Sequence, residues 1–309
     1  MRRVEHLISQ VRRQTENVRV GTSDGIDDIE FVQYLNDAQD RLMTAVIKAN
    51  NRSFTKEATF SPVKGQEAYD LPFDTFTKTS VINLQYSQTG QDRDYGPVHL
   101  ATFEERDTTD GYPINYILRN GQILINPIPL TSNGLFRLTY NPRLPKLDIR
   151  SGQITSFSQG GSNITALTLN NAFTITLTNA RFNEIDEITI VDRDGVIKTY
   201  DFDIDSVNTS SGVVTITNGS HTLLSGESIA NNQYVCLGNY TTTHSRLPDM
   251  AERYLVSYCA WKIFKRDSSE DRKDQENEIM MMERDIIEAF ALQTGDVDYI
   301  PIINDSWWS

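Results

Sequence analysis

The stretch from Asp27 to Asn50 constrains the fold most, because it repeats apolar residues in the pattern of an amphipathic helix. The apolar positions are spaced by three and four residues: Phe31, Leu35, Ala38, Leu42, Ala45 and Ala49. One face of this helix therefore needs a covering partner, whereas the residues between these positions are mostly polar. The candidate partners lie some two hundred residues further along the chain.

Three more stretches show helical periodicity, near the two ends of the chain. Arg3 to Val18 is a short amphipathic stretch and the only clearly basic segment. An almost wholly apolar helix is expected from Pro248, and one with a densely charged face from Asp271 to Leu292. We predict that the four helices form one bundle. Its predicted core residues are Phe31, Leu35, Leu42, Tyr254, Tyr258, Trp261, Ile279, Met282 and Ile286.

Between the helical stretches, two regions of different composition have the short alternating runs of β-strands. The first is expected to be a small antiparallel region, with a hairpin turn at Asn120-Gly121. Its expected strands are 58–60, 67–71, 80–86, 114–119, 122–125 and 135–140. The second is rich in Thr, Asn, Ser and Gly, and short strands at its spacing predict a sandwich or small barrel. Its expected strands are 153–157, 166–169, 174–177, 187–191, 196–203, 213–217 and 234–237.

The predicted fold class is therefore α+β: a helical bundle from both chain ends, an antiparallel β region and an inserted sandwich-like or barrel-like domain. The predicted parts are 1–57 and 241–294 for the bundle, 58–147 for the β region, 148–240 for the insertion and 295–309 for an extended docking tail. This tail ends in Trp307 and Trp308. Exposed Trp pairs are unfavourable in water, so we expect them to dock on the chain's own body or on a partner.

The charge balance limits what the chain binds. A formal net charge of −13 argues against a protein that grips nucleic-acid phosphates, although it suits a wall past which nucleic acid slides. No apolar run approaches the length of a membrane span, so we expect a chain made in the cytoplasm that does not enter a membrane. Cys236 and Cys259 form no ligand cluster, and we expect both to be reduced and packed.

The sequence predicts no catalytic residue, no cofactor and no metal. No Walker loop, HExxH, GxSxG or nucleotide-binding glycine motif occurs. The four histidines are scattered, with no local partner for a nucleophile and base: His6, His99, His221 and His244. The acidic run around Asp192 to Asp205 lacks the spacing of an EF-hand, and a β-turn at Asp194-Gly195 beside an acidic strand explains it better.

Specific residues resemble a known family. The text Tyr112-Pro113-Ile114-Asn115-Tyr116, then Gly121 to Pro129 ending in Pro127-Ile128-Pro129, then Leu138-Thr139-Tyr140, is similar to that of tailed-phage head-to-tail adaptor proteins, also called connector or neck proteins. Phe31 to Gln39 and Tyr69-Asp70-Leu71-Pro72 resemble the early segment of the same family. The resemblance covers the chain to about Arg150 and the returning C-terminal helices.

The resemblance implies a structural virion protein at the head–tail junction, assembled in the host cytoplasm. Such proteins form a homo-oligomeric ring, commonly a dodecamer, between the portal and a tail or nozzle protein. The ring would be a conduit for genomic DNA, without sequence-specific binding, and a platform for tail attachment. The acidic face of Asp271 to Glu288 would line or flank the channel. The C-terminal segment would dock on the portal, which implies portal contacts at Ile302, Ile303, Trp307 and Trp308.

Two other classes of protein stay open. A receptor-binding or baseplate protein would also be acidic and rich in strands, with residues 151–239 as a carbohydrate-binding β domain. Such a protein should form trimers, and this interpretation does not explain the four helices. An enzyme would need a convergent polar pocket, which the sequence does not indicate.

Overall fold

The computed structural model describes residues 2–15, 27–50, 52, 54–77, 80–106, 109–160, 163–170, 187–208, 210–217, 227–266 and 272–291. These residues form two compact units. The helix–barrel unit contains the residues up to Met43 and Pro145–Ile286. The curled-sheet unit contains Thr44–Leu144 and the end of the last helix from Ile287.

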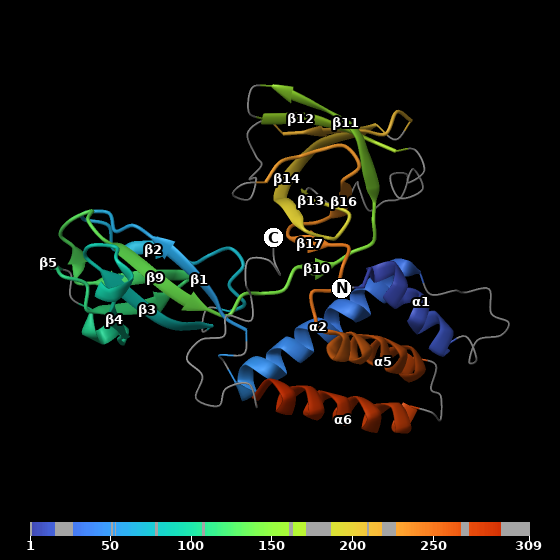
Figure 1. Cartoon of the computed structure of the whole chain (residues 1–309), viewed down its shortest axis with the longest axis horizontal. Helices are drawn as coiled ribbons and strands as arrows, with labels where there is room; N and C mark the ends of the chain where they lie inside the picture. The colour runs from blue at the N-terminus through green and yellow to red at the C-terminus, as the bar shows by residue number, and fades with distance from the viewer. Residues whose placement is uncertain are drawn as a thin grey trace. The chain divides into compact units, whose positions relative to one another are not determined.

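Four helices occur in the described part of the chain (Figure 1): α1 Val4–Thr15, α2 Asp28–Ala49, α5 Asp249–Arg266 and α6 Arg272–Ala291. Ion pairs connect them within the helix–barrel unit. Arg266 of α5 lies 2.6 Å from Glu30 of α2. Arg41 of α2 lies 2.8 Å from Glu283 of α6. The fourth helix, α1, packs along α5, and its residues Val4, Leu7 and Val11 are fully buried.

The buried stripe of α2 differs from the predicted one at its end. Phe31, Leu35, Ala38 and Leu42 are buried, but the stripe continues to Val46, and Ala49 is exposed. Ala49 is the last residue of the helix, where the periodic pattern no longer determines burial. Gln39 lies on the predicted polar side and is nevertheless only 2% exposed.

The second β region is a closed barrel, which decides between the sandwich and barrel alternatives. Its strands are β11 Gly152–Gly160, β12 Asn163–Leu169, β13 Glu187–Val191, β14 Ile197–Asn208, β15 Val213–Ile216 and β16 Tyr234–Leu237. They pair antiparallel in the order β11-β12-β15-β14-β13-β16, and β16 returns to β11. Closure leaves no free sheet edge. The strand expected at 174–177 lies outside the described residues.

The barrel core consists of inward-facing apolar side chains, with Phe202 fully buried among Ile154, Ile188 and Ile190. A second cluster lies on the opposite face of β13, β14 and β16, where Val191, Tyr234 and Cys236 pack with Tyr240. Alternate residues of these strands are thus buried on both faces, which explains the continuous burial along β16.

Two short strands, the neck strands β10 Lys146–Leu147 and β17 Thr241–Thr242, pair in parallel where the chain enters and leaves the barrel. Polar side chains of α2 hold the first of them. Asn36 donates to the Leu147 carbonyl at 2.9 Å and accepts from the Leu147 N–H at 2.7 Å. Gln39 donates to the Pro145 carbonyl at 2.9 Å. The polar residues of α2 therefore connect helices and barrel within this unit.

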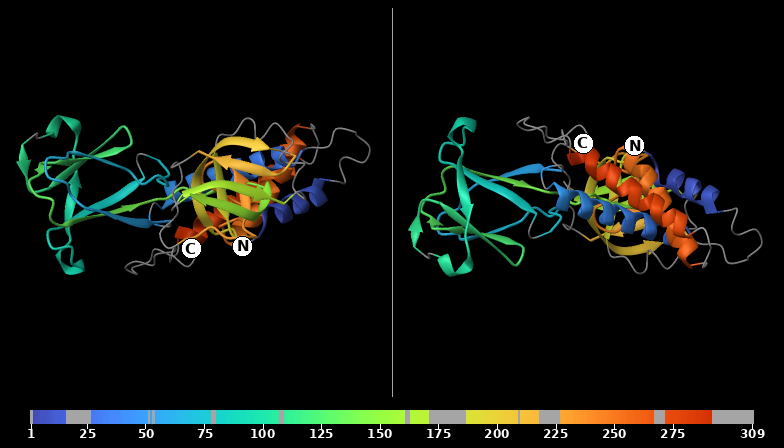
Figure 2. Two further views of the ribbon diagram at one scale, coloured as in Figure 1. Left: turned by 90° about the horizontal axis from the view of Figure 1, so that it is seen from above. Right: turned by 90° about the horizontal axis from the view of Figure 1, so that it is seen from below.

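The curled-sheet unit is built on seven strands: β1 Lys56–Phe60, β2 Ala68–Asp70, β3 Val81–Ser87, β4 Gly96–Leu100, β6 Asn115–Arg119, β7 Gln122–Asn126 and β9 Leu135–Tyr140. Their order is β1-β9-β3-β4-β6-β7-β2. The two edge strands share one core, since the rings of Phe60 and Tyr69 lie 5.1 Å apart. The sheet therefore curls around its aromatic core, as Figure 2 shows from two sides.

The prediction of an antiparallel region is wrong for two strand pairs. β4 runs parallel to β6, and the short strands β5 Asp110–Gly111 and β8 Ile128–Pro129 are also parallel. The sequence prediction missed β4 because Gly96-Pro97 resembles a turn. The connection between β4 and β6 contains the 3-10 helix Phe103–Glu105 and is long enough for a parallel crossover. A 3-10 helix at Asp92–Asp94 lies between β3 and β4.

The predicted α+β class is confirmed, with four helices and both β regions in the described residues. These contacts do not test whether the four helices form a single bundle, which therefore stays a prediction.

Candidate functional site

A groove with polar and charged lining residues lies between α1, α5 and α6 and has a volume of about 610 Å³. Residues of all three helices, together with Arg2, line this arginine groove: Arg2, Gln10, Arg13, Gln14, Arg253, Val256, Ser257, Glu278 and Met282. Val256 and Ser257 are buried and form its floor. Figure 2, in the view from below, shows the helices that frame it.

The cations of the groove differ in their partners. Arg2 is paired, since its Nε lies 3.3 Å from Glu252 Oε2 and its backbone N–H donates to Glu252 Oε1 at 3.0 Å. Arg13 donates to the Ser9 carbonyl at 3.3 Å. Within the described residues, neither Arg13 nor Arg253 has a carboxylate in ion-pair range. The groove thus presents two guanidinium groups to solvent.

Glu252 lies behind the groove and binds Arg2, which lines it. Its side chain is fully buried in the first turn of α5. Burial raises the pKa of the carboxyl group, and the hydrogen bond and positive charge of Arg2 oppose that rise. Glu252 is therefore a positioning residue that fixes Arg2 at the groove.

The outer side of α6 is acidic. Asp274, Met281, Asp285 and Glu288 are exposed and spaced by seven, four and three residues, so they form one line along the helix. This acidic stripe lies opposite Ile279, Ile286 and Phe290, which are buried. The sequence predicted a charged face here, and the burial of the helix now defines which residues it contains.

The predicted bundle core maps onto the inner sides of α2, α5 and α6. Eight of its nine residues are buried, and Met282 is half-buried beside the groove. The ion pair of Arg41 and Glu283 contacts two of these core residues. Arg41 stacks on the Tyr258 ring, and the Tyr254 hydroxyl donates to Glu283 at 3.3 Å. Burial, and next the Glu283 charge, raise the pKa of Tyr254, so this hydroxyl stays protonated. These contacts give the residues structural roles.

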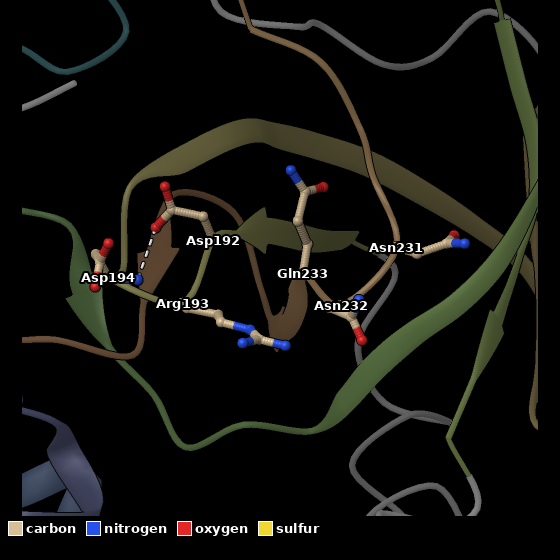
Figure 3. Close-up of a pocket in the computed structure, with 6 residues that line it drawn as sticks. All are labelled: Asp192, Arg193, Asp194, Asn231, Asn232 and Gln233. Carbon is tan, nitrogen blue, oxygen red and sulfur yellow. Dashed lines mark hydrogen bonds between the residues drawn. The ribbon is translucent and has the colours of Figure 1, made fainter.

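A second hollow lies on the barrel, between the β13–β14 turn and the turn before β16. Figure 3 shows its lining residues: Asp192, Arg193, Asp194, Asn231, Asn232 and Gln233. Asp192 Oδ1 accepts from the Asp194 and Val196 N–H groups, and Lys198 lies 3.4 Å from Oδ2. The Gln233 amide binds Ala230 and Ser228 of its own turn. Asp192 and Gln233 thus hold their own turns, and the other side chains that line the hollow are those of Arg193, Asp194, Asn231 and Asn232.

The β-turn in this acidic run lies one residue earlier than predicted. The Gly195 N–H donates to the Asp192 carbonyl, which places Arg193 and Asp194 at the turn centre and Gly195 at its end. Gly195 has φ +81°, and a Cβ there would lie 2.6 Å from the His244 ring. Only glycine therefore fits both the backbone conformation and the close approach.

His244 belongs to the neck and is 6% exposed. Its Nδ1 lies 2.9 Å from the Thr243 hydroxyl, and Arg246 donates to the Gly195 carbonyl at 2.7 Å. Burial, together with the charges of Arg3 and Arg246, lowers the pKa of His244 to about 4. The imidazole is therefore neutral at pH 7 and has a structural setting.

The sequence prediction missed an apolar surface on the curled-sheet unit. Leu100, Tyr112, Ile114 and Leu130 are at least half exposed. Phe103 is 47% exposed and lies between Arg119, 4.4 Å from its ring centroid, and Arg106. The aromatic and proline-rich text of 112–116 was the available signal, but the sequence analysis used it only for the family resemblance and for the strand expected at 114–119.

The remaining sequence predictions concern the cysteines, metal binding, membrane spans and the C-terminal tail. Cys236 and Cys259 are free thiols and buried, and burial raises the pKa of Cys259. No metal-binding group of His, Cys, Asp and Glu side chains occurs among the described residues. Across the same residues, no helix has both the length and the apolar character of a membrane span. His221 and the predicted portal contacts Ile302, Ile303, Trp307 and Trp308 lie outside the described residues.

Residues 3–152 match the family described as SU10 adaptor protein. The match begins just before α1 and ends where β11 starts, so it covers α1, α2 and the whole curled sheet. The barrel and the returning helices α5 and α6 lie beyond it. No curated protein matches the chain. The match over residues 3–152 confirms the predicted resemblance of this part of the chain to phage head-to-tail adaptor proteins.

Proposed function

We propose that the protein forms a ring between the portal and the tail of a phage virion, with a channel for the genome and a platform for tail attachment. The family match over residues 3–152 carries this proposal, since a phage adaptor is a structural component of the virion. The ring, its dodecameric size, and the portal and tail partners are the proposed parts. In this account the protein has a mechanical and steric role, without catalysis.

Within each subunit, we propose that α1, α2, α5 and α6 act as one bundle. The pairs Arg266–Glu30 and Arg41–Glu283, together with the buried inner side chains, support a joint core. The neck contacts of Asn36 with Leu147 support the barrel as an insertion carried by the helices. The domain boundaries proposed from the sequence remain those at 57, 147, 240 and 294.

The charge pattern supports a conduit that does not hold DNA. The net charge is −13, and the charged face of α6 has a further exposed carboxylate outside the acidic stripe, at Glu278. Carboxylates that line or flank a channel repel phosphates and keep a polyanion mobile. A carbohydrate-binding barrel has weaker support, because Asp192 and Gln233 bind their own turns and the described residues that line its hollow include no aromatic side chain.

Ile302, Ile303, Trp307 and Trp308 stay the proposed portal contacts. Copurification with the cognate portal protein tests them. We expect the full chain to bind, and a variant with Trp307→Ala and Trp308→Ala to lose most of that binding. A matched variant with Phe73→Ala removes an exposed aromatic of the curled-sheet unit and should bind as wild type. Full binding by the double variant would contradict the portal contact.

A further inference from the structure

We infer that the arginine groove of one copy binds the acidic stripe on α6 of a second copy. This inference rests on the proposed ring and names the two surfaces that join its subunits. The partner copy supplies the carboxylates, and the groove supplies Arg13 and Arg253. A helix laid in a groove is a common mode of protein recognition.

The groove has cationic groups in excess of its own carboxylates. Other exposed arginines of the helix–barrel unit face a carboxylate of the same chain: Arg12 lies 2.6 Å from Asp28, and Arg266 lies 2.6 Å from Glu30. Arg13 and Arg253 have no such partner among the described residues, although Glu278 lines the same groove. Two guanidinium groups without a carboxylate partner among the described residues favour an acidic occupant.

The acidic stripe has the complementary composition. Asp274 and Asp285 form no ion pair with any residue that the structure describes. Met281, which lies between them on the same line, is 63% exposed. An exposed Met flanked by carboxylates suits a pocket with an apolar floor and cationic walls, because the thioether adapts to irregular contacts. The buried floor residue Val256 offers that contact.

A contact between opposite charges would also offset the repulsion between copies that each carry a net charge of −13. Copies of such a chain repel one another over most orientations, so association needs a local pairing of opposite charge. The groove and the stripe are different surfaces, so after one contact one copy still has an unoccupied stripe and the other an unoccupied groove. Such a heterologous contact continues from copy to copy and closes into a ring when the rotation permits.

Charge reversal in the full chain tests the inference, with the mass of the assembly as the readout. Arg13→Glu with Arg253→Glu should raise the dissociation constant between copies at least ~10-fold, and Asp274→Lys with Asp285→Lys should do the same. An equimolar mixture of the two double variants should recover mixed assemblies, because each supplies the surface that the other has lost. Circular dichroism checks that each variant is folded.

Lys64→Glu with Arg193→Glu is the matched control for the groove reversal, since it makes the net charge more negative by the same amount at exposed sites outside the groove. It should assemble as wild type. If wild type assembles and neither groove nor stripe reversal weakens it, the inference is wrong while the proposed ring stands. If wild type itself stays monomeric, the proposed ring fails and the inference with it. If groove reversal keeps the mass but abolishes binding of a labelled DNA duplex, the groove is a phosphate site and the inference is overturned.

Discussion

At the residue scale, His244 shows how burial at the neck makes a side chain sensitive to pH. Its imidazole lies against Gly195 and between the charges of Arg3 and Arg246, with Asp194 as the opposing charge. The pKa in the folded protein is about 4, below the ordinary value of 6.5, so folding favours the neutral ring. This contribution to stability is complete above about pH 6.5 and is lost as the pH falls toward 4.

We therefore expect the free energy of unfolding to fall by about 2 to 3 kcal/mol between pH 7 and pH 4 from this group. A His244→Asn variant keeps a hydrogen-bond acceptor near Thr243 and should have a flatter profile over the same range. Urea unfolding of both proteins at several pH values measures the difference. Parallel profiles would show that His244 does not carry the effect.

Asn36 gives a second prediction at this scale. It binds both backbone groups of Leu147, which is 1% exposed, so Asn36→Ala leaves a buried donor and acceptor unsatisfied. The expected loss of stability is about 1 to 3 kcal/mol. Gln33→Ala on the exposed side of the same helix is the control and should change stability by less than about 0.5 kcal/mol. Equal denaturation midpoints for the two variants would contradict the role of Asn36.

At the scale of elements, periodicity predicted what local patterns determine. The four helices, the hairpin at Asn120-Gly121 and most strands follow from spacing and turn residues. Features that depend on distant contacts were not predictable. Gln39 is buried because the Pro145 carbonyl needs a donor, and β4 lies beside β6 because a long connection returns it there. The arginine groove joins residues from both chain ends, so no local pattern indicated it.

The barrel gives the prediction at this scale. Phe202 is fully buried in its core, so Phe202→Ala should cost about 3 to 5 kcal/mol of stability through lost contacts and a cavity. Hydrogen exchange should show lost protection in β11 to β16 before α5 loses any, if the barrel is an insertion carried by the helices. Simultaneous loss in α5 and the barrel would show that the two form one cooperative element.

At the scale of the whole molecule, the family match covers residues 3–152, whereas the acidic stripe and Arg253 of the groove lie after residue 152. The sequence indicated the family because its signature lies in local strand and turn text, whereas the assembly surfaces depend on how α1, α5 and α6 meet. The central claim is that this chain assembles into a closed ring. Light scattering with negative-stain class averages of the purified chain, alone and with the portal protein, measures mass and symmetry most directly. We expect rings of one symmetry that weaken in about 1 M salt, where charges are screened. A trimer, or a monomer that ignores the portal, would contradict it.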